Sequence, residues 1–279
     1  MRTTLTQGSI IEDTRSEKYV NIRCKGIVIT ARCDIANRKV QNIHYLTALS
    51  IEDWLHEVFV PEILEKRRRN ILGSIKGFAS SHKLDYKTLI DMGYEKAAFV
   101  MESSTTKQRE KENVKLWVEA WRQCDSNISS VMTKEQKQLI LKKHGTSNLK
   151  SKLTSLYNCN CPKYCFIPAC AYTVDSSKTE GLVVDLQDIH QISMKESWDI
   201  LDNKYDYKDI RDQEKREHIN QKFFFEDEED FVMIDCTVRP PWIERLLQEF
   251  TYLFSRIGLD NAEEEEIEAY CKELLGEGI

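Results

Sequence analysis

The sequence predicts an α+β protein in which both ends of the chain build a small β-barrel or a strongly bent sheet. Three observations predict this class. Short β-branched runs fill the first fifty residues and return after Cys170. Residues 51–156 show helical periodicity. A cluster of cysteines lies between this helical stretch and the second β-rich stretch. We therefore expect a β-rich core of residues 1–50 and 171–279 and a mostly helical insertion of residues 51–170.

The N-terminal region reads as consecutive short strands. Residues 8–11 open a first strand, residues 19–24 alternate with period two, and Lys25-Gly26 allows a turn. The run at residues 26–31 is continuously apolar and β-branched, which is typical of a buried central strand. Residues 40–49 return as another strand, so the spacing favours a barrel or a bent sheet.

The middle of the chain carries helix signals. Ser50 can cap a helix that Pro61 interrupts or restarts, and Thr133 caps a later one. Beyond the cysteines, residues 181–186 form a strand, and Ser193 begins a capping box. An acidic run at residues 226–230 predicts the exposed turn of a hairpin.

The strongest helix signal lies near the C-terminus. Apolar residues recur at intervals of three and four from Ile243 to Ile257, and Gly258 is placed to end the helix. We expect this helix to be a core element. A last helix is predicted over residues 262–275, with four glutamates in its first turns.

Charge is distributed unevenly along the chain. Residues 61–156 carry 19 basic and 11 acidic side chains, whereas residues 175–279 carry 12 basic and 28 acidic ones. Either these are solvated helix faces, or the insertion offers a positive surface to nucleic acid and the C-terminal part an acidic surface to a basic partner. The run Lys66, Arg67, Arg68 and Arg69 is the candidate nucleic-acid contact.

Four of the nine cysteines lie within twelve residues, with the spacing C-x-C-x3-C-x4-C: Cys159, Cys161, Cys165 and Cys170. Thiolates this close are a plausible ligand set for one tetrahedral Zn²⁺, and such a structural zinc would staple the insertion to the core. Cys33 and His44 are alternatives for the fourth ligand. The competing interpretation is a group of free cysteines around a proline-stiffened turn.

Cellular context follows from the same residues. The first eight residues lack the apolar core of a secretory signal, and no apolar run approaches the length of a membrane helix. We expect a cytoplasmic protein without membrane contact, in a compartment that keeps thiols reduced. The sequence shows no phosphate loop, nucleophile elbow or H-E-x-x-H motif, so it leaves any catalytic activity unassigned.

Two stretches resemble a poorly characterised group of bacterial proteins, some of them encoded near anti-phage defence genes. The first runs from Gly8 to Ser50 and is carried by residues 8–11, GIVITARCDI at residues 26–35 and residues 40–50. The second is RPPWIERLLQEFTYLFSRIG at residues 239–258, where Pro240 replaces the usual serine. The match covers about a quarter of the chain. The resemblance implies a bacterial protein with a role in antiviral defence, and it carries no assigned activity.

The N-terminal part also resembles the small barrel of PemK/MazF-type toxins, which open with G-D-I and place a buried strand next. Those ribonucleases carry Arg-Pro before that strand, where this chain has Lys25-Gly26.

Taken together, the cysteine cluster, the basic insertion and the resemblances predict a zinc-binding adaptor or binding subunit of a cytosolic bacterial protein assembly, with protein partners and contact to DNA or RNA. The alternative is an RNA-directed, toxin-like nuclease effector that uses the barrel.

Overall fold

The computed structural model describes residues 4–20, 22–129, 131–158, 160–172, 181–202, 222–225 and 231–255. The chain forms two compact units. The sheet unit comprises residues 1–50 and 155–279, and the helical unit comprises residues 51–154. The predicted α+β class is confirmed.

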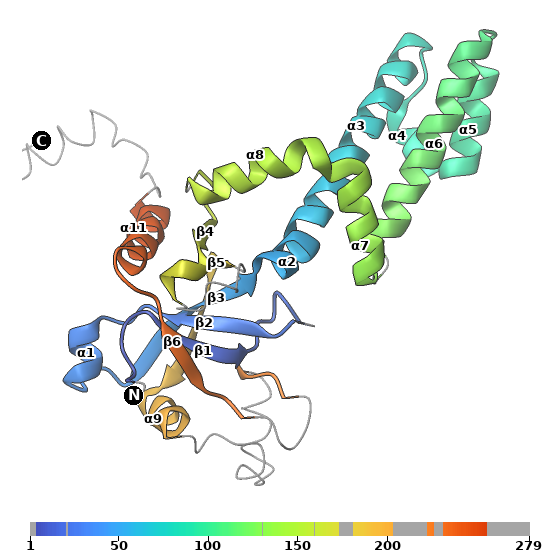
Figure 1. Ribbon diagram of the computed structural model, residues 1–279. Coiled ribbons are helices and arrows are strands. Elements are labelled where there is room, and N and C mark those ends of the chain that lie inside the picture. The colour runs from blue at the N-terminus through green and yellow to red at the C-terminus, as the bar shows by residue number, and fades with distance from the viewer. Residues whose placement is uncertain are drawn as a thin grey trace, which may run out of the picture. The chain divides into compact units, whose positions relative to one another are not determined.

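The sheet unit contains one antiparallel sheet that curls into a half barrel (Figure 1). Its described strands follow the order β4-β5-β3-β2-β1-β6. Register shifts interrupt the β1–β2, β1–β6 and β3–β5 pairings, and such bulges bend a sheet locally. The strands are β1 (Ser9–Thr14), β2 (Cys24–Val28), β3 (Asn42–Ser50), β4 (Tyr164–Ile167), β5 (Leu182–Ser193) and β6 (Ile234–Thr237). The sheet is thus built from segments that precede and follow the helical unit in sequence, and β4 comes from residues that the sequence analysis assigned to the insertion.

Two local predictions for the N-terminal region are wrong. Residues 18–20 form a turn rather than a strand, and the hydroxyl of Tyr19 donates to the buried Oδ2 of Asp185 at 2.8 Å. This contact draws the tyrosine ring inward from a turn. Gly26 does not make a turn but lies inside β2, where an added Cβ would come within 2.6 Å of the Tyr45 ring. Close packing across the sheet, not chain reversal, explains the glycine.

Two apolar clusters cover the sheet, one on each face, because residues along a strand alternate between faces. The first cluster includes Ile11, Val28, Ile43 and Tyr45, together with Ile200 of α9 (Met194–Leu201). The second consists of Ile10, Ile27, Leu46, Ala48, Cys165, Ile167, Ala171, Leu182, Val184, Leu186, Val238, Ile243 and Leu246. Short α1 (Arg32–Ala36) follows β2, and the 3₁₀ turn η3 (Ala169–Ala171) follows β4. The predicted capping box of Ser193 with Glu196 is confirmed at the start of α9.

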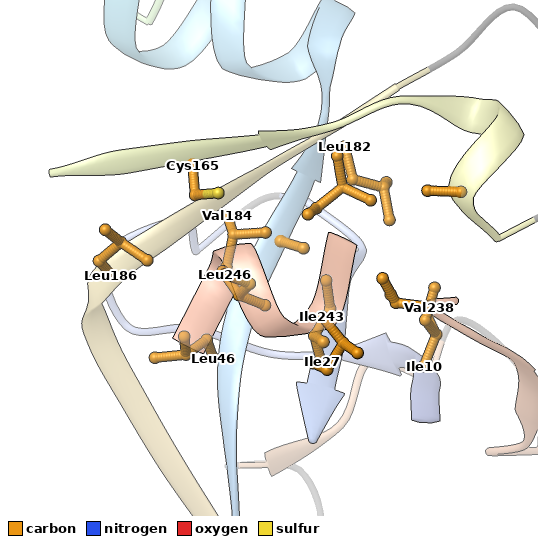
Figure 2. Close-up of a cluster of buried hydrophobic side chains, with 13 residues drawn as sticks. Ile10, Ile27, Leu46, Cys165, Leu182, Val184, Leu186, Val238, Ile243 and Leu246 are labelled. Carbon is orange, nitrogen blue, oxygen red and sulfur yellow. The ribbon is translucent and has the colours of Figure 1, made fainter. Parts of the chain in front are cut away.

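The predicted C-terminal core helix is confirmed as α11 (Trp242–Ser255). Ile243 and Leu246 are fully buried in the second cluster, and Leu247, Phe250 and Leu253 pack against it while partly exposed. Figure 2 shows Leu246 and Ile243 beside strand residues such as Val184 and Ile27. The predicted helix over residues 262–275 and the acidic turn at residues 226–230 lie outside the described residues.

The helical unit is built around α3 (Val60–Ser81) and α6 (Gln108–Ser129), whose apolar faces share one cluster that includes Ile75, Val114 and Trp121. The other elements are α2 (Ile51–Trp54), the π-helical turn η1 (Leu55–Phe59), α4 (Tyr86–Asp91), α5 (Tyr94–Ser103), α7 (Lys134–Ile140), the π-helical turn η2 (Leu141–Gly145) and α8 (Thr146–Tyr157). Thr133 caps α7 as predicted.

One polar network joins three helices of this unit. Asp125 on α6 accepts from Nε of Arg68 on α3 and, at 2.8 Å, from the hydroxyl of Tyr94 on α5. Arg68 thereby links α3 to α6. Among the residues that the structure describes, no helix is both long enough and apolar enough to span a membrane.

Candidate functional site

A polar cluster that the sequence analysis missed lies on the face of the sheet that carries the first apolar cluster. Asp188 and His190 stand two residues apart on β5, and Nε2 of His190 lies 3.1 Å from Oδ1 of Asp188. Burial opposes ionisation of Asp188, but the polar side chains of His190, Thr47 and Ser16 around it outweigh burial and lower the pKa of Asp188 to about 2. The carboxylate thus stays charged beside the imidazole.

Tyr45 connects this pair to the centre of the sheet. Its ring stacks on His190 with the centroids 5.5 Å apart, and it lies over Gly26 together with the methyl group of Thr14. Burial, followed by the charge of Asp188, raises the pKa of Tyr45. Within the described residues, the buried hydroxyls of Tyr45 and Thr14 have no hydrogen-bond partner. A buried hydroxyl normally has one, so both are available to a water or a bound polar group.

The chemistry of this cluster is that of proton transfer. An imidazole held by a carboxylate can act as a general base, and neighbouring hydroxyls can donate to a developing negative charge. Side-chain exposure of 26% for His190 and 17% for Asp188 keeps the pair within reach of solvent. The one signal in the sequence was the alternation Asp188-x-His190 within a strand, which places both side chains on one face.

A second buried carboxylate, Asp185, has a structural role. Its Oδ2 accepts from Nζ of Lys18 and from the Tyr19 hydroxyl, and its Oδ1 accepts from the backbone N–H of Gln187 at 3.0 Å. Asp185 lies opposite Tyr164 of β4 in the sheet register. With three donors satisfying it, the carboxylate ties the turn at residues 18–20 to the β4–β5 edge.

The candidate zinc ligands do not share one environment. Cys165 is fully buried on β4, and Figure 2 shows its sulfur among Val184, Leu186 and their apolar neighbours. Cys161 is partly exposed, Cys170 is exposed on η3, and Cys159 lies outside the described residues. Cys165 pairs with Val184 of β5 in the sheet register. Because paired residues on neighbouring strands face the same side of the sheet, Cys165 is buried together with Val184. Its surroundings are those of a packing cysteine.

Two further ligand candidates are exposed. The thiol of Cys33 on α1 points to its neighbour, with Sγ 3.6 Å from Oδ1 of Asp34, and His44 lies on β3. In the part of the chain that the structure describes, no three histidine, cysteine, aspartate or glutamate side chains are grouped to hold a metal ion.

The predicted basic run lies on α3, and its four residues differ in their surroundings. Lys66 and Arg69 are exposed, Arg67 is partly buried, and Arg68 is held by Asp125. Lys76 is exposed farther along the same helix. Residues 66–83 contain six lysines and arginines and no aspartate or glutamate. Spacings of three and seven residues place Lys66, Arg69 and Lys76 on one side of α3.

Comparison with known proteins adds no family: no protein-family model, no curated protein and no solved structure matches this chain.

Proposed function

We propose that this protein is a binding subunit that contacts nucleic acid through the exposed side of α3. The observation that carries the proposal is the row of Lys66, Arg69 and Lys76, in a segment of the helix free of acidic residues. Cations arranged in this way neutralise phosphates and release their counterions, which is the main source of sequence-independent affinity. We propose further that the sheet unit binds other proteins of a bacterial assembly, and that this assembly acts in anti-phage defence.

Replacing Lys66, Arg69 and Lys76 together by alanine is expected to abolish most nucleic-acid binding without unfolding the protein. The plot of log K against log [salt] has a negative slope of about 0.9 per phosphate contact, so losing three contacts should make it shallower by roughly 3. Binding is measured by fluorescence anisotropy between low and physiological salt. Arg68 is left intact because its contact with Asp125 joins α3 to α6.

The matched control replaces three exposed lysines outside α3, namely Lys87, Lys96 and Lys143. It removes the same charge, so its affinity should remain close to that of the unchanged protein if the α3 row is the contact. If both variants lost the same affinity, the loss would be due to the change in net charge and not to the α3 row. A protein that binds neither DNA nor RNA in a salt-sensitive way would refute the proposal.

A second candidate function, an RNA-directed nuclease effector, is favoured by the Asp188–His190 pair and the buried hydroxyls beside it. The same binding assay separates the two functions. RNA that is cleaved during incubation, with cleavage lost in His190→Ala, supports the effector. RNA that is bound and remains intact supports the binding subunit.

We also propose that the cysteines of residues 159–170 hold a structural zinc. The protein purified anaerobically is expected to contain about one zinc per chain, since these thiolates suit a tetrahedral ion. Because a structural zinc contributes to folding, Cys161→Ser should lower both the zinc content and the melting temperature. Cys165→Ala removes a buried core side chain and should lower the melting temperature, and its zinc content shows whether Cys165 is also a ligand. Elemental analysis with thermal unfolding tests both variants, and wild-type protein without zinc would exclude the site.

A further inference from the structure

The exposed side of α3 contains two glycines that packing within the protein does not require. Apart from the helix's own backbone, a Cβ added to Gly73 or to Gly77 would meet no atom of the described residues within 4 Å. Glycine inside a helix costs about 0.5–1 kcal/mol relative to alanine, so each residue lowers stability without a compensating contact in the described structure. A partner that approaches the bare helix backbone would explain both positions.

These glycines lie within the basic row. Residues 69, 73, 76, 77 and 80 recur at the intervals of three and four that place residues on one side of a helix. All five residues are exposed. At about 1.5 Å per residue, Lys66 and Lys76 stand roughly 15 Å apart along the axis, with Gly73 between them. Lys66 and Arg69 lie at one end of this span and Lys76 at the other, whereas Gly73 between Arg69 and Lys76 has no side chain, and Gly77 directly follows Lys76.

This shape fits a double helix better than a single strand. Proteins that bind single strands without sequence preference stack the bases on exposed aromatic rings. The only aromatic residue of α3, Phe78, is buried in the core of the helical unit. In B-form DNA, two phosphate rows flank a major groove about 12 Å wide, which cations roughly 15 Å apart can bridge.

We propose that α3 crosses the major groove of double-stranded B-form DNA, with Gly73 and Gly77 facing the duplex and the flanking cations contacting phosphates of both strands. This inference rests on the proposed nucleic-acid binding and names its substrate class. Contact is to the backbone, so the affinity is independent of sequence. The major groove of duplex RNA is too deep and narrow for this approach.

The test replaces a glycine without changing any charge. In the full-length protein, Gly73→Leu should weaken binding to a DNA duplex of about 20 base pairs by about tenfold or more, because the side chain holds the helix away from the groove. Ser74→Leu is the matched control, since Ser74 is also exposed but is turned about 100° around the helix. Binding to a single strand of the same length should be weaker than to the duplex and equal in both variants.

The outcomes separate this inference from the proposed function. If the unchanged protein binds no nucleic acid, the proposed function itself fails. If it binds salt-sensitively but prefers single-stranded DNA or duplex RNA, or if Gly73→Leu binds duplex DNA as tightly as Ser74→Leu, only the duplex-DNA inference is overturned.

Discussion

Replacing Leu246 by alanine is expected to lower the free energy of unfolding by about 2–5 kcal/mol, the usual cost of opening a cavity in a packed core. Leu246 is fully buried where α11 meets the sheet, in the cluster that Figure 2 shows. The loss of its side chain opens a cavity in a cluster whose strand residues come from both ends of the chain. Urea unfolding followed by tryptophan fluorescence measures the change.

Tyr252→Ala on the same helix provides the control. Tyr252 is 59% exposed, and a change there should alter the free energy of unfolding by no more than about 0.5 kcal/mol. If Leu246→Ala were as stable as the unchanged protein, α11 would not belong to the core, and its apolar side would be available to a partner.

Gly26→Ala is expected to cost about 1–3 kcal/mol, the range for inserting atoms into a filled core. Its Cβ would lie 2.6 Å from Cδ2 of Tyr45 and 3.0 Å from the methyl carbon of Thr14. The ring cannot easily move aside, because it is fully buried and stacked on His190. Thermal and urea unfolding give the size of the loss.

The same substitution at Gly73 serves as the control with the opposite sign. There the Cβ meets no atom of the neighbouring described residues within 4 Å, so Gly73→Ala should stabilise the helix by about 0.5–1 kcal/mol. A stable Gly26→Ala protein would show that the Tyr45 side chain has room to shift, and that the polar cluster around it is less tightly held than the structure indicates.

Local pattern was sufficient for the parts of the fold that depend on neighbours in sequence. The three-and-four repeat of residues 243–257 identified α11, and the Ser193–Glu196 pair marked the start of α9. The apolar run at residues 26–31 overlaps the last three residues of β2. These signals arise from backbone geometry and capping, which act over a few residues. The bent sheet followed from where such strands occurred along the chain.

The polar cluster could not be predicted in the same way, because it depends on strand register. Tyr45 contacts His190 only because β3 pairs with β5. No local sequence pattern in either strand indicates that the two strands are neighbours. Tyr19 was interpreted as a strand residue because its neighbours alternate, but a distant carboxylate, that of Asp185, draws it into a turn. Long-range pairing also moves Cys165 from a compact sequence motif into the core.

The pairing of Ser50 with Leu182 has a consequence for how the chain assembles. The two residues are about 130 positions apart, and the entropic cost of closing a loop grows with the logarithm of its length. The helical unit lies between them in sequence, and the hydrogen bonds within its helices join near neighbours in sequence, which generally form fastest. During synthesis, β3 emerges long before β5, so one hydrogen-bonding edge of this apolar strand stays open until the ribosome has passed Leu182. Nascent chains in this interval are therefore the form most exposed to aggregation.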